Sequence, residues 1–181
     1  MTDNAGNAEK KNSVVADVLT MSIDEFAKKY QHPFLVVGDF SEGDKDGESE
    51  DLPVSFQTMA VSNAKTAYAE GAVYPVIKRR GANTFSFITI GRSKNNDIVI
   101  DAGAISKLHA VIQEKDSQFT LMDSSSTNGT RLNDHPLIPQ KPIKMNPGDL
   151  ITFAGQISAR FFDPRAVYIW IVKKGLTRSQ A

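Results

Sequence analysis

The chain has 181 residues, a hydrophobic fraction of 40% and no cysteine, so it can hold one domain with an appendage and cannot form disulfides or thiolate metal sites. Its net charge is zero, but residues 1–75 contain 13 acidic and 6 basic side chains, whereas residues 76–181 contain 8 and 15. This asymmetry favours an anionic partner for the second half over diffuse surface charge. Three scattered histidines, His32, His109 and His135, argue against a histidine metal site, and we expect neither a metal nor another cofactor.

Residues 1–20 are polar, and their composition predicts a disordered tail. The next segment, residues 21–71, is predicted to be an extension that contains a helix over residues 22–30. Its first residues match a capping box, because Ser and Glu stand three positions apart ahead of an apolar helical face. A strand-like apolar run, FLVV, follows the helix. Residues 41–51 contain no apolar side chain and predict a mobile acidic loop.

From residue 72 onward the pattern changes to many short strand-like runs separated by turn signals, which predicts a mainly β sandwich or barrel over residues 72–162. The last segment, residues 163–181, has Pro164 near its start and Gly175 after two lysines, as expected at the two ends of a helix. Its central run VYIWIV is equally typical of a strand, but the two end signals favour a helix.

Neither signal peptide nor membrane span is evident, because the N-terminus has no long apolar stretch and no segment approaches the roughly 20 apolar residues needed to cross a bilayer. We therefore expect a cytoplasmic protein. The sequence makes no prediction of the oligomeric state.

Three loops in the β half combine residues that suit a tetrahedral anion. The stretches GRSKNND, ISKLHAVI and DSSSTNGTRL together offer a guanidinium group, an ammonium group, several hydroxyls and an amide. Arginine binds phosphate through charge-assisted, often bidentate hydrogen bonds, and hydroxyls add neutral donors. The candidate residues are Gly91, Arg92, Ser106, Lys107, His109, Thr127, Asn128 and Gly129.

The order and spacing of these three stretches resemble the forkhead-associated (FHA) domain, a family that reads phosphorylated motifs, and we expect a bacterial member. The resemblance covers about residues 73–162. It implies an eleven-stranded β-sandwich whose site lies in the apical loops. With the flanking segments, the expected fold is an FHA-type sandwich with a helix-containing N-terminal extension and a C-terminal helix.

The resemblance also implies a role for each residue. Arg92 would contact the phosphate or steady its loop, Ser106 would donate to a phosphate oxygen, and Lys107 would supply charge. Thr127 would lie beside the phosphothreonine, and Asn128 would hold the peptide backbone. The family's architectural positions correspond to Gly91, His109 and Gly129.

The expected function is therefore a non-enzymatic module that binds phosphothreonine in partner proteins, in signalling or scaffolding downstream of a Ser/Thr kinase. Two alternatives remain open. The domain could bind its own phosphorylated tail, or it could be a structural FHA-like domain that has lost phosphate binding. An acyl-transfer enzyme is disfavoured because Ser106 lacks a Gly-x-Ser-x-Gly elbow.

Nucleic acid is not an expected partner. The basic residues 78–80 form a short cluster that lacks interleaved aromatic residues, which favours a solvated strand end over a nucleic-acid patch. The apolar surface of the N-terminal helix and of VYIWIV predicts that these segments pack against the sandwich or against each other, away from the apical loops.

Overall fold

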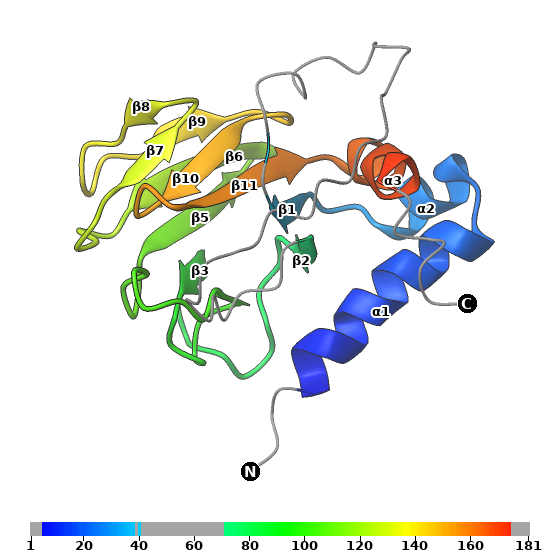
Figure 1. The fold of residues 1–181 in the computed structure, drawn as a ribbon, viewed down its shortest axis with the longest axis horizontal. Helices are drawn as coiled ribbons and strands as arrows, with labels where there is room; N and C mark the ends of the chain where they lie inside the picture. Colours follow the sequence, from blue (N-terminus) through cyan, green and yellow to red (C-terminus); the bar gives the residue numbers. More distant parts are fainter. Residues whose placement is uncertain (1–4, 39, 41–70, 175–181) are drawn as a thin grey trace, which may run out of the picture.

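The computed structural model of the chain describes residues 5–38, 40 and 71–174. Within them, eleven strands form two facing sheets, and three helices lie beside one of the sheets (Figure 1). The first sheet has the order β2 (Ala72–Pro75), β1 (Phe34–Val37), β11 (Ile157–Phe162), β10 (Leu150–Phe153), β7 (Thr130–Leu132) and β8 (His135–Pro136). The second has the order β4 (Ile98–Val99), β3 (Ile88–Gly91), β5 (Ala110–Lys115), β6 (Gln118–Asp123) and β9 (Ile143–Met145).

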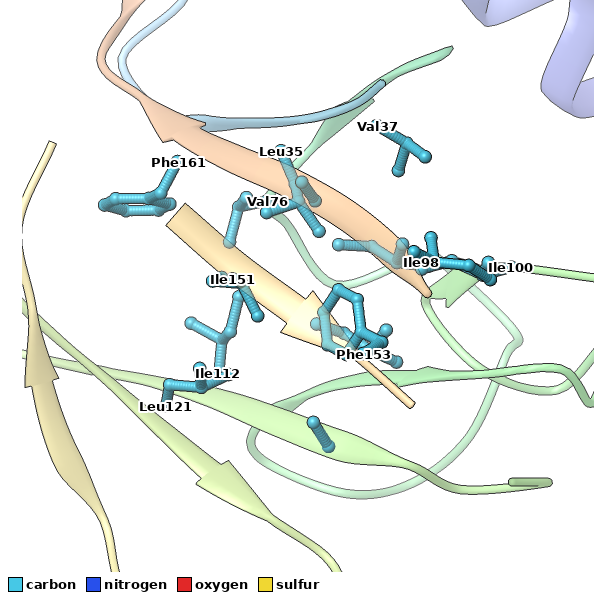
Figure 2. Packing of buried hydrophobic residues seen from close by; sticks show 14 of the residues in the cluster. Leu35, Val37, Val76, Ile98, Ile100, Ile112, Leu121, Ile151, Phe153 and Phe161 are labelled. Carbon is cyan, nitrogen blue, oxygen red and sulfur yellow. The ribbon is translucent and has the colours of Figure 1, made fainter. Parts of the chain in front are cut away.

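All strand pairs are antiparallel except β3 with β4. This arrangement confirms the predicted mainly β sandwich. Alternating side chains of each strand point into the space between the sheets. Strand β10 shows the pattern, because Ile151 and Phe153 are buried in the core while Thr152 between them is partly exposed. They pack with residues of the opposite sheet such as Ile112 and Leu121 (Figure 2).

The run FLVV is a strand, as predicted, and it lies inside the first sheet. Strand β1 pairs with β2 on one side and with β11 on the other. Leu35 and Val37 belong to the core between the sheets, whereas Phe34 and Val36 belong to a second hydrophobic cluster under the helices. Both faces of β1 are covered, which explains why its sequence is continuously apolar.

The three helices, α1 (Ala5–Thr20), α2 (Ile23–Lys29) and α3 (Pro164–Lys173), cover the outer face of the first sheet near β1 and β11 (Figure 1). The N-terminal helical region and α3 contact each other there. The Arg165 guanidinium forms a 2.6 Å ion pair with Asp24, and the Tyr168 hydroxyl donates to the Met21 carbonyl at 3.0 Å. The expected packing of the N-terminal helix and the C-terminal segment is thus present.

The predicted disordered tail over residues 1–20 is wrong for residues 5–20, which form α1. Val14 and Val18 stand one helical turn apart and are 3% and 5% exposed against the second cluster. Their burial stabilises a helix whose polar composition alone gave no such signal. Residues 1–4 and the acidic segment 41–51 lie outside the described residues.

The ends of the other two helices follow their sequence signals. Ser22 and Glu25 form the predicted capping box, since the Ser22 amide donates to Glu25 Oε2 at 2.8 Å and the Glu25 amide donates to Ser22 Oγ at 3.3 Å. In the C-terminal segment, Pro164–Lys173 form a helix and not a strand. Asp163 caps it by accepting from the Ala166 amide at 2.8 Å, directly before Pro164. None of the described helices is long and apolar enough to cross a membrane.

Candidate functional site

Three loops meet at one end of the sandwich, and Ser106 connects them. The loop after β3 is joined to it because the Arg92 amide donates to the Ser106 carbonyl at 3.0 Å. The loop after β6 is joined because the Thr127 amide donates to Ser106 Oγ at 3.0 Å, and the two hydroxyl oxygens are 3.3 Å apart. Ser106 therefore holds together the loop that carries Arg92 and the loop that carries Thr127.

His109 holds the base of these loops through both ring nitrogens. Its Nδ1 accepts from the Ser106 amide at 3.1 Å, and its Nε2 lies 3.2 Å from the Gly129 carbonyl. The side chain is buried, and burial lowers the pKa of His109, although the Gly129 carbonyl and the charge of Asp123 act in the opposite direction. A neutral ring with the proton on Nε2 satisfies both contacts. The predicted architectural position of His109 thus has a geometric basis.

Gly91 is required by a close approach of two loops. A Cβ atom at this position would lie 2.4 Å from the Lys107 carbonyl oxygen and 2.9 Å from Asn96 Nδ2. The buried Asn96 side chain donates to the Ser93 and Lys107 carbonyls at 2.8 and 2.6 Å, which holds the loops after β3 and β4 together. Gly129 has a φ of 74°, a left-handed conformation that glycine adopts without strain.

Two exposed cations flank Ser106: Arg92, whose amide donates to the Ser106 carbonyl, and Lys107, the next residue in the chain. Neither the Arg92 guanidinium nor the Lys107 ammonium group forms a hydrogen bond or an ion pair with any of the described residues. Asn128 extends the site, because its Nδ2 donates to the Ala104 carbonyl at 2.9 Å and its Oδ1 makes no hydrogen bond within the described part of the chain.

The hydroxyl residues around Thr127 divide into those at the site surface and those that brace the loop. Ser126 Oγ and Thr130 Oγ1 donate to the Asp123 carboxylate at 2.6 and 2.5 Å. Burial alone would raise the pKa of Asp123. These hydrogen bonds outweigh burial and lower the pKa below its ordinary value, so the carboxylate stays charged. Ser125 Oγ accepts from Gln140 Nε2 at 3.1 Å. The Thr127 hydroxyl is therefore at the exposed surface, while its neighbours stabilise the turn.

A second polar network, which the sequence did not predict, anchors the other end of the loop after β3. The Asp97 side chain has no exposed surface and forms a 2.7 Å ion pair with Lys78. It also accepts from the Arg79 amide at 2.7 Å and from the Thr89 amide at 2.8 Å. Burial alone would raise the pKa of Asp97, but these hydrogen bonds lower it to about 2.

Lys78 is exposed and Arg79 is partly exposed just past the end of β2, but their polar groups also bind the loop after β3. Arg80 is exposed, as predicted. The partners of Asp97 are 8 to 19 positions away in the sequence. No local pattern could have paired them, and the only available signal was a lone acidic residue among basic ones.

All eight residues singled out in the sequence lie in or under this loop cluster. Direct hydrogen bonds link Arg92, Ser106 and Thr127, and Asn128 and Lys107 flank them. His109 and the two glycines support the cluster from below. The surface thus offers two cations, two hydroxyls and a carboxamide within one group of loops, a donor set suited to a phosphate carried on an extended chain.

Parts of the chain are similar in sequence to known proteins. A 112-residue region, 57% of this chain, is 33% identical to the transcriptional regulatory protein EmbR of Mycobacterium tuberculosis H37Rv and covers 26% of that protein. A 67-residue region, 36% of this chain, is 34% identical to the Arabidopsis thaliana FHA domain-containing protein At4g14490 and covers 17% of it. The chain thus matches about a quarter or less of the length of these relatives.

Among solved structures, M. tuberculosis EmbR in complex with a low-affinity phosphopeptide is similar to this chain with a TM-score of 0.45 and 19% sequence identity. The match covers 90% of this chain and 32% of the EmbR chain. The FhaA FHA domain complexed with the intracellular domain of Rv3910 also has a TM-score of 0.45, at 18% identity. That match covers 71% of this chain and 98% of the FhaA chain. The FHA domain family model matches residues 88–154, which contain all three site loops. By this match, residues 88–154 of the chain are an FHA domain.

Proposed function

We propose that this protein binds phosphothreonine-containing segments of partner proteins at the loop cluster of Arg92, Ser106 and Thr127. The observation that carries the proposal is the exposed Arg92 guanidinium on the same loop whose backbone is bonded to Ser106, next to the paired hydroxyls of Ser106 and Thr127. The match of residues 88–154 to the FHA domain model supports the same proposal, because FHA domains recognise phosphorylated motifs.

The donors would be used as follows. Arg92 gives charge-assisted hydrogen bonds to two phosphate oxygens. The Ser106 hydroxyl, which contacts Thr127 Oγ1 in the free protein, rotates to donate to a third oxygen. Lys107 adds positive charge at the rim. The free Oδ1 of Asn128 accepts from a peptide amide, while its Nδ2 keeps the loop after β4 in place.

A binding role fits the geometry better than catalysis at Ser106. The nearest base, His109, uses Nδ1 for the Ser106 amide and Nε2 for the Gly129 carbonyl. Neither nitrogen is available to take a proton from the Ser106 hydroxyl. We therefore place the protein as a reader downstream of a Ser/Thr kinase, in signalling or scaffolding, and not as an enzyme.

Binding of the protein's own tail has less support from the described residues. The Thr20 hydroxyl donates to the Ala16 carbonyl at 3.1 Å, and Ser22 caps α2. Both would have to leave the helical layer to reach the loops. Loss of phosphate binding is disfavoured by the exposed Arg92 and the intact Ser106–Thr127 pair.

The test is titration of the full chain with a phosphothreonine peptide library and with its unphosphorylated counterpart. We expect roughly micromolar affinity for bound phosphopeptides, about −8 kcal/mol. Arg92→Ala should weaken binding by about 1.5–3 kcal/mol, the range for hydrogen bonds to charged groups. Lys144→Ala, on β9 in the same sheet, is the matched control that removes an exposed cation elsewhere. Equal binding of phosphorylated and unphosphorylated peptides would refute the proposal.

A further inference from the structure

The connection between β2 and β3, residues 76–87, lies directly against the loop that carries Arg92. The Arg79 guanidinium donates to the Lys94 carbonyl, and Asn83 Nδ2 donates to the Asn95 carbonyl at 3.0 Å. Lys94 is only two residues beyond Arg92, so at most about 7 Å of chain separates this contact from the proposed phosphate contact. The connection therefore borders the binding site.

This border is positively charged. Residues 76–97 contain five basic side chains and a single acidic one, Asp97. Asp97 is fully buried and already paired with Lys78, so it does not neutralise the surface. Arg80, Arg92 and Lys94 are all exposed. Over separations near the Debye length of about 8 Å at physiological salt, exposed charges of one sign still add to a common field.

The same connection presents an exposed aromatic ring. Phe85 is 50% exposed and stacks on Phe87, with ring centroids 5.0 Å apart and an interplanar angle of 10°. Its amide donates to Asn83 Oδ1 at 3.1 Å, and that oxygen also accepts from Lys78 Nζ at 2.7 Å. The backbone of Phe85 is thus tied to the Asp97 network, and its ring is stacked on Phe87. A pre-ordered aromatic side chain gives a partner contact area at little entropic cost.

We infer that Arg80, Phe85 and Lys94, here called the β2–β3 flank, extend the phosphopeptide site and bind an acidic segment next to the phosphothreonine. Asp or Glu residues of the ligand would face Arg80 and Lys94, and an apolar side chain would lie on Phe85. This inference rests on the proposed function, because the ligand would be the same chain that carries the phosphate.

A peptide fits the flank better than a nucleic acid. Of the five basic residues in 76–97, Lys78 and Arg79 are used for internal contacts. The remaining exposed charges are too few for the row of phosphate contacts that gives nucleic-acid binding its affinity. Continuity with the Arg92 loop also places the flank on the path of a peptide leaving the phosphate site.

The experiment compares two sets of phosphothreonine peptides, one with Asp and Glu and one with Ala at the positions flanking the phosphothreonine on both sides. Dissociation constants are measured by fluorescence anisotropy with the full chain. We expect the acidic set to bind about three- to tenfold more tightly, since exposed ion pairs are individually weak. The double variant Arg80→Gln/Lys94→Gln should bring the ratio of the two dissociation constants close to one. Phe85→Ala should weaken the binding of acidic peptides that also carry an apolar residue beside the acids, and it should leave the binding of the other peptides unchanged.

The matched control is Lys115→Gln/Lys144→Gln, which removes the same charge from the end of β5 and from β9, and it should keep the ratio. A ratio near one in the unaltered protein, or a ratio unchanged in Arg80→Gln/Lys94→Gln, would overturn the inference while phosphorylation-dependent binding persisted. Displacement of the acidic phosphopeptide by a DNA or RNA oligonucleotide, lost in the same variant, would also overturn it. Failure of every phosphopeptide to bind better than its unphosphorylated form would instead refute the proposed function.

Discussion

His109 shows how one residue under the site decides its shape. The ring accepts from the Ser106 amide and contacts the Gly129 carbonyl, so it joins the two loops that carry the hydroxyls. Protonation would place a hydrogen on Nδ1 opposite the hydrogen of the Ser106 amide. The contact would then become repulsive, and the loop that holds Ser106 would be released.

The first prediction concerns pH. Burial lowers the pKa of His109 below its ordinary value of about 6.5, so the unfolded chain takes up the proton first as the pH falls. The free energy of unfolding should therefore be highest above about pH 6.5 and should decrease between that pH and the lower pKa of the folded state. Urea unfolding between pH 5 and 8 measures this, and His109→Gln should flatten the curve in that range. A stability that increases on acidification would contradict the prediction.

The second prediction concerns Gly91. Gly91→Ala would push a Cβ atom against the Lys107 carbonyl, a backbone atom that cannot move without displacing the loop. We expect a loss of about 1–3 kcal/mol in the free energy of unfolding, as for other overpacked sites, together with weaker phosphopeptide binding. Gly103→Ala is the control, because its Cβ would meet no atom within 4 Å. Equal stability of the two variants in thermal unfolding would show that the loops can separate freely.

At the scale of elements, the site is a set of loops fixed from two sides. Ser106 and Asn128 join the loops after β4 and β6, and Asp97 joins the β2–β3 connection to the loop after β3. Each loop is thereby held by a neighbour and not by its own sequence alone. Because the loops are already ordered, they lose less conformational entropy when a ligand binds.

The third prediction concerns Ser106. Ser106→Ala leaves the Thr127 amide without its acceptor and removes one proposed phosphate donor. Phosphopeptide binding should weaken by about 1–2 kcal/mol, while the melting temperature changes little, because the loop is partly exposed and water can replace the hydroxyl. Calorimetric titration and thermal unfolding give the two values. Ser125→Ala, in the loop of Thr127 but with its hydroxyl toward Gln140, should leave affinity unchanged.

The fourth prediction concerns Asp97. Its pKa of about 2 lies below the ordinary value near 3.9, so it stabilises the folded state above about pH 4, and this contribution is lost as the pH falls from about 4 toward 2. Asp97→Asn should lower the free energy of unfolding by about 2 kcal/mol at neutral pH, since hydrogen bonds to a charged acceptor are lost. Urea unfolding at pH 7 and pH 3 should show a smaller difference between the two proteins at the lower pH. An equal difference at both would exclude a charged role for Asp97.

At the scale of the whole molecule, the sandwich and the helical layer share strand β1. Its Leu35 and Val37 fill the core between the sheets, and its Phe34 and Val36 lie under α1, α2 and α3. Phe26 of α2 is fully buried and contacts Tyr30, Phe34 and Tyr168. The N-terminal segment is therefore a structural part of the sandwich and not an independent appendage.

The fifth prediction follows from β1. A fragment of residues 71–181 leaves β2 and β11 without the strand between them and exposes their apolar side chains. We expect it to aggregate or to lack a cooperative unfolding transition. A chain lacking only residues 1–20 keeps the Ser22 cap of α2 and strand β1 and should fold, with a loss of about 3 kcal/mol from the burial of Val14 and Val18. Circular dichroism during heating distinguishes them, and a fragment 71–181 as stable as the full chain would contradict the prediction.

The sequence by itself determined the features that depend on local pattern. Short-range spacing was sufficient for the strands, for the capping box at Ser22, for the Pro164 helix start and for the three site loops with Arg92, Ser106 and Asn128. These signals arise from residues within a few positions of each other, where backbone preferences and side-chain alternation act directly.

Only the tertiary structure decided the rest. The burial of Val14 and Val18 that stabilises α1, the place of β1 between β2 and β11, and the Asp97 network all join residues far apart in the chain. Their energies come from contacts that exist only after the sheets have formed, so no local window contains them. For the same reason, the sequence could predict an anion site at Arg92 and Ser106, but not that the β2–β3 connection is bound to the loop that carries Arg92.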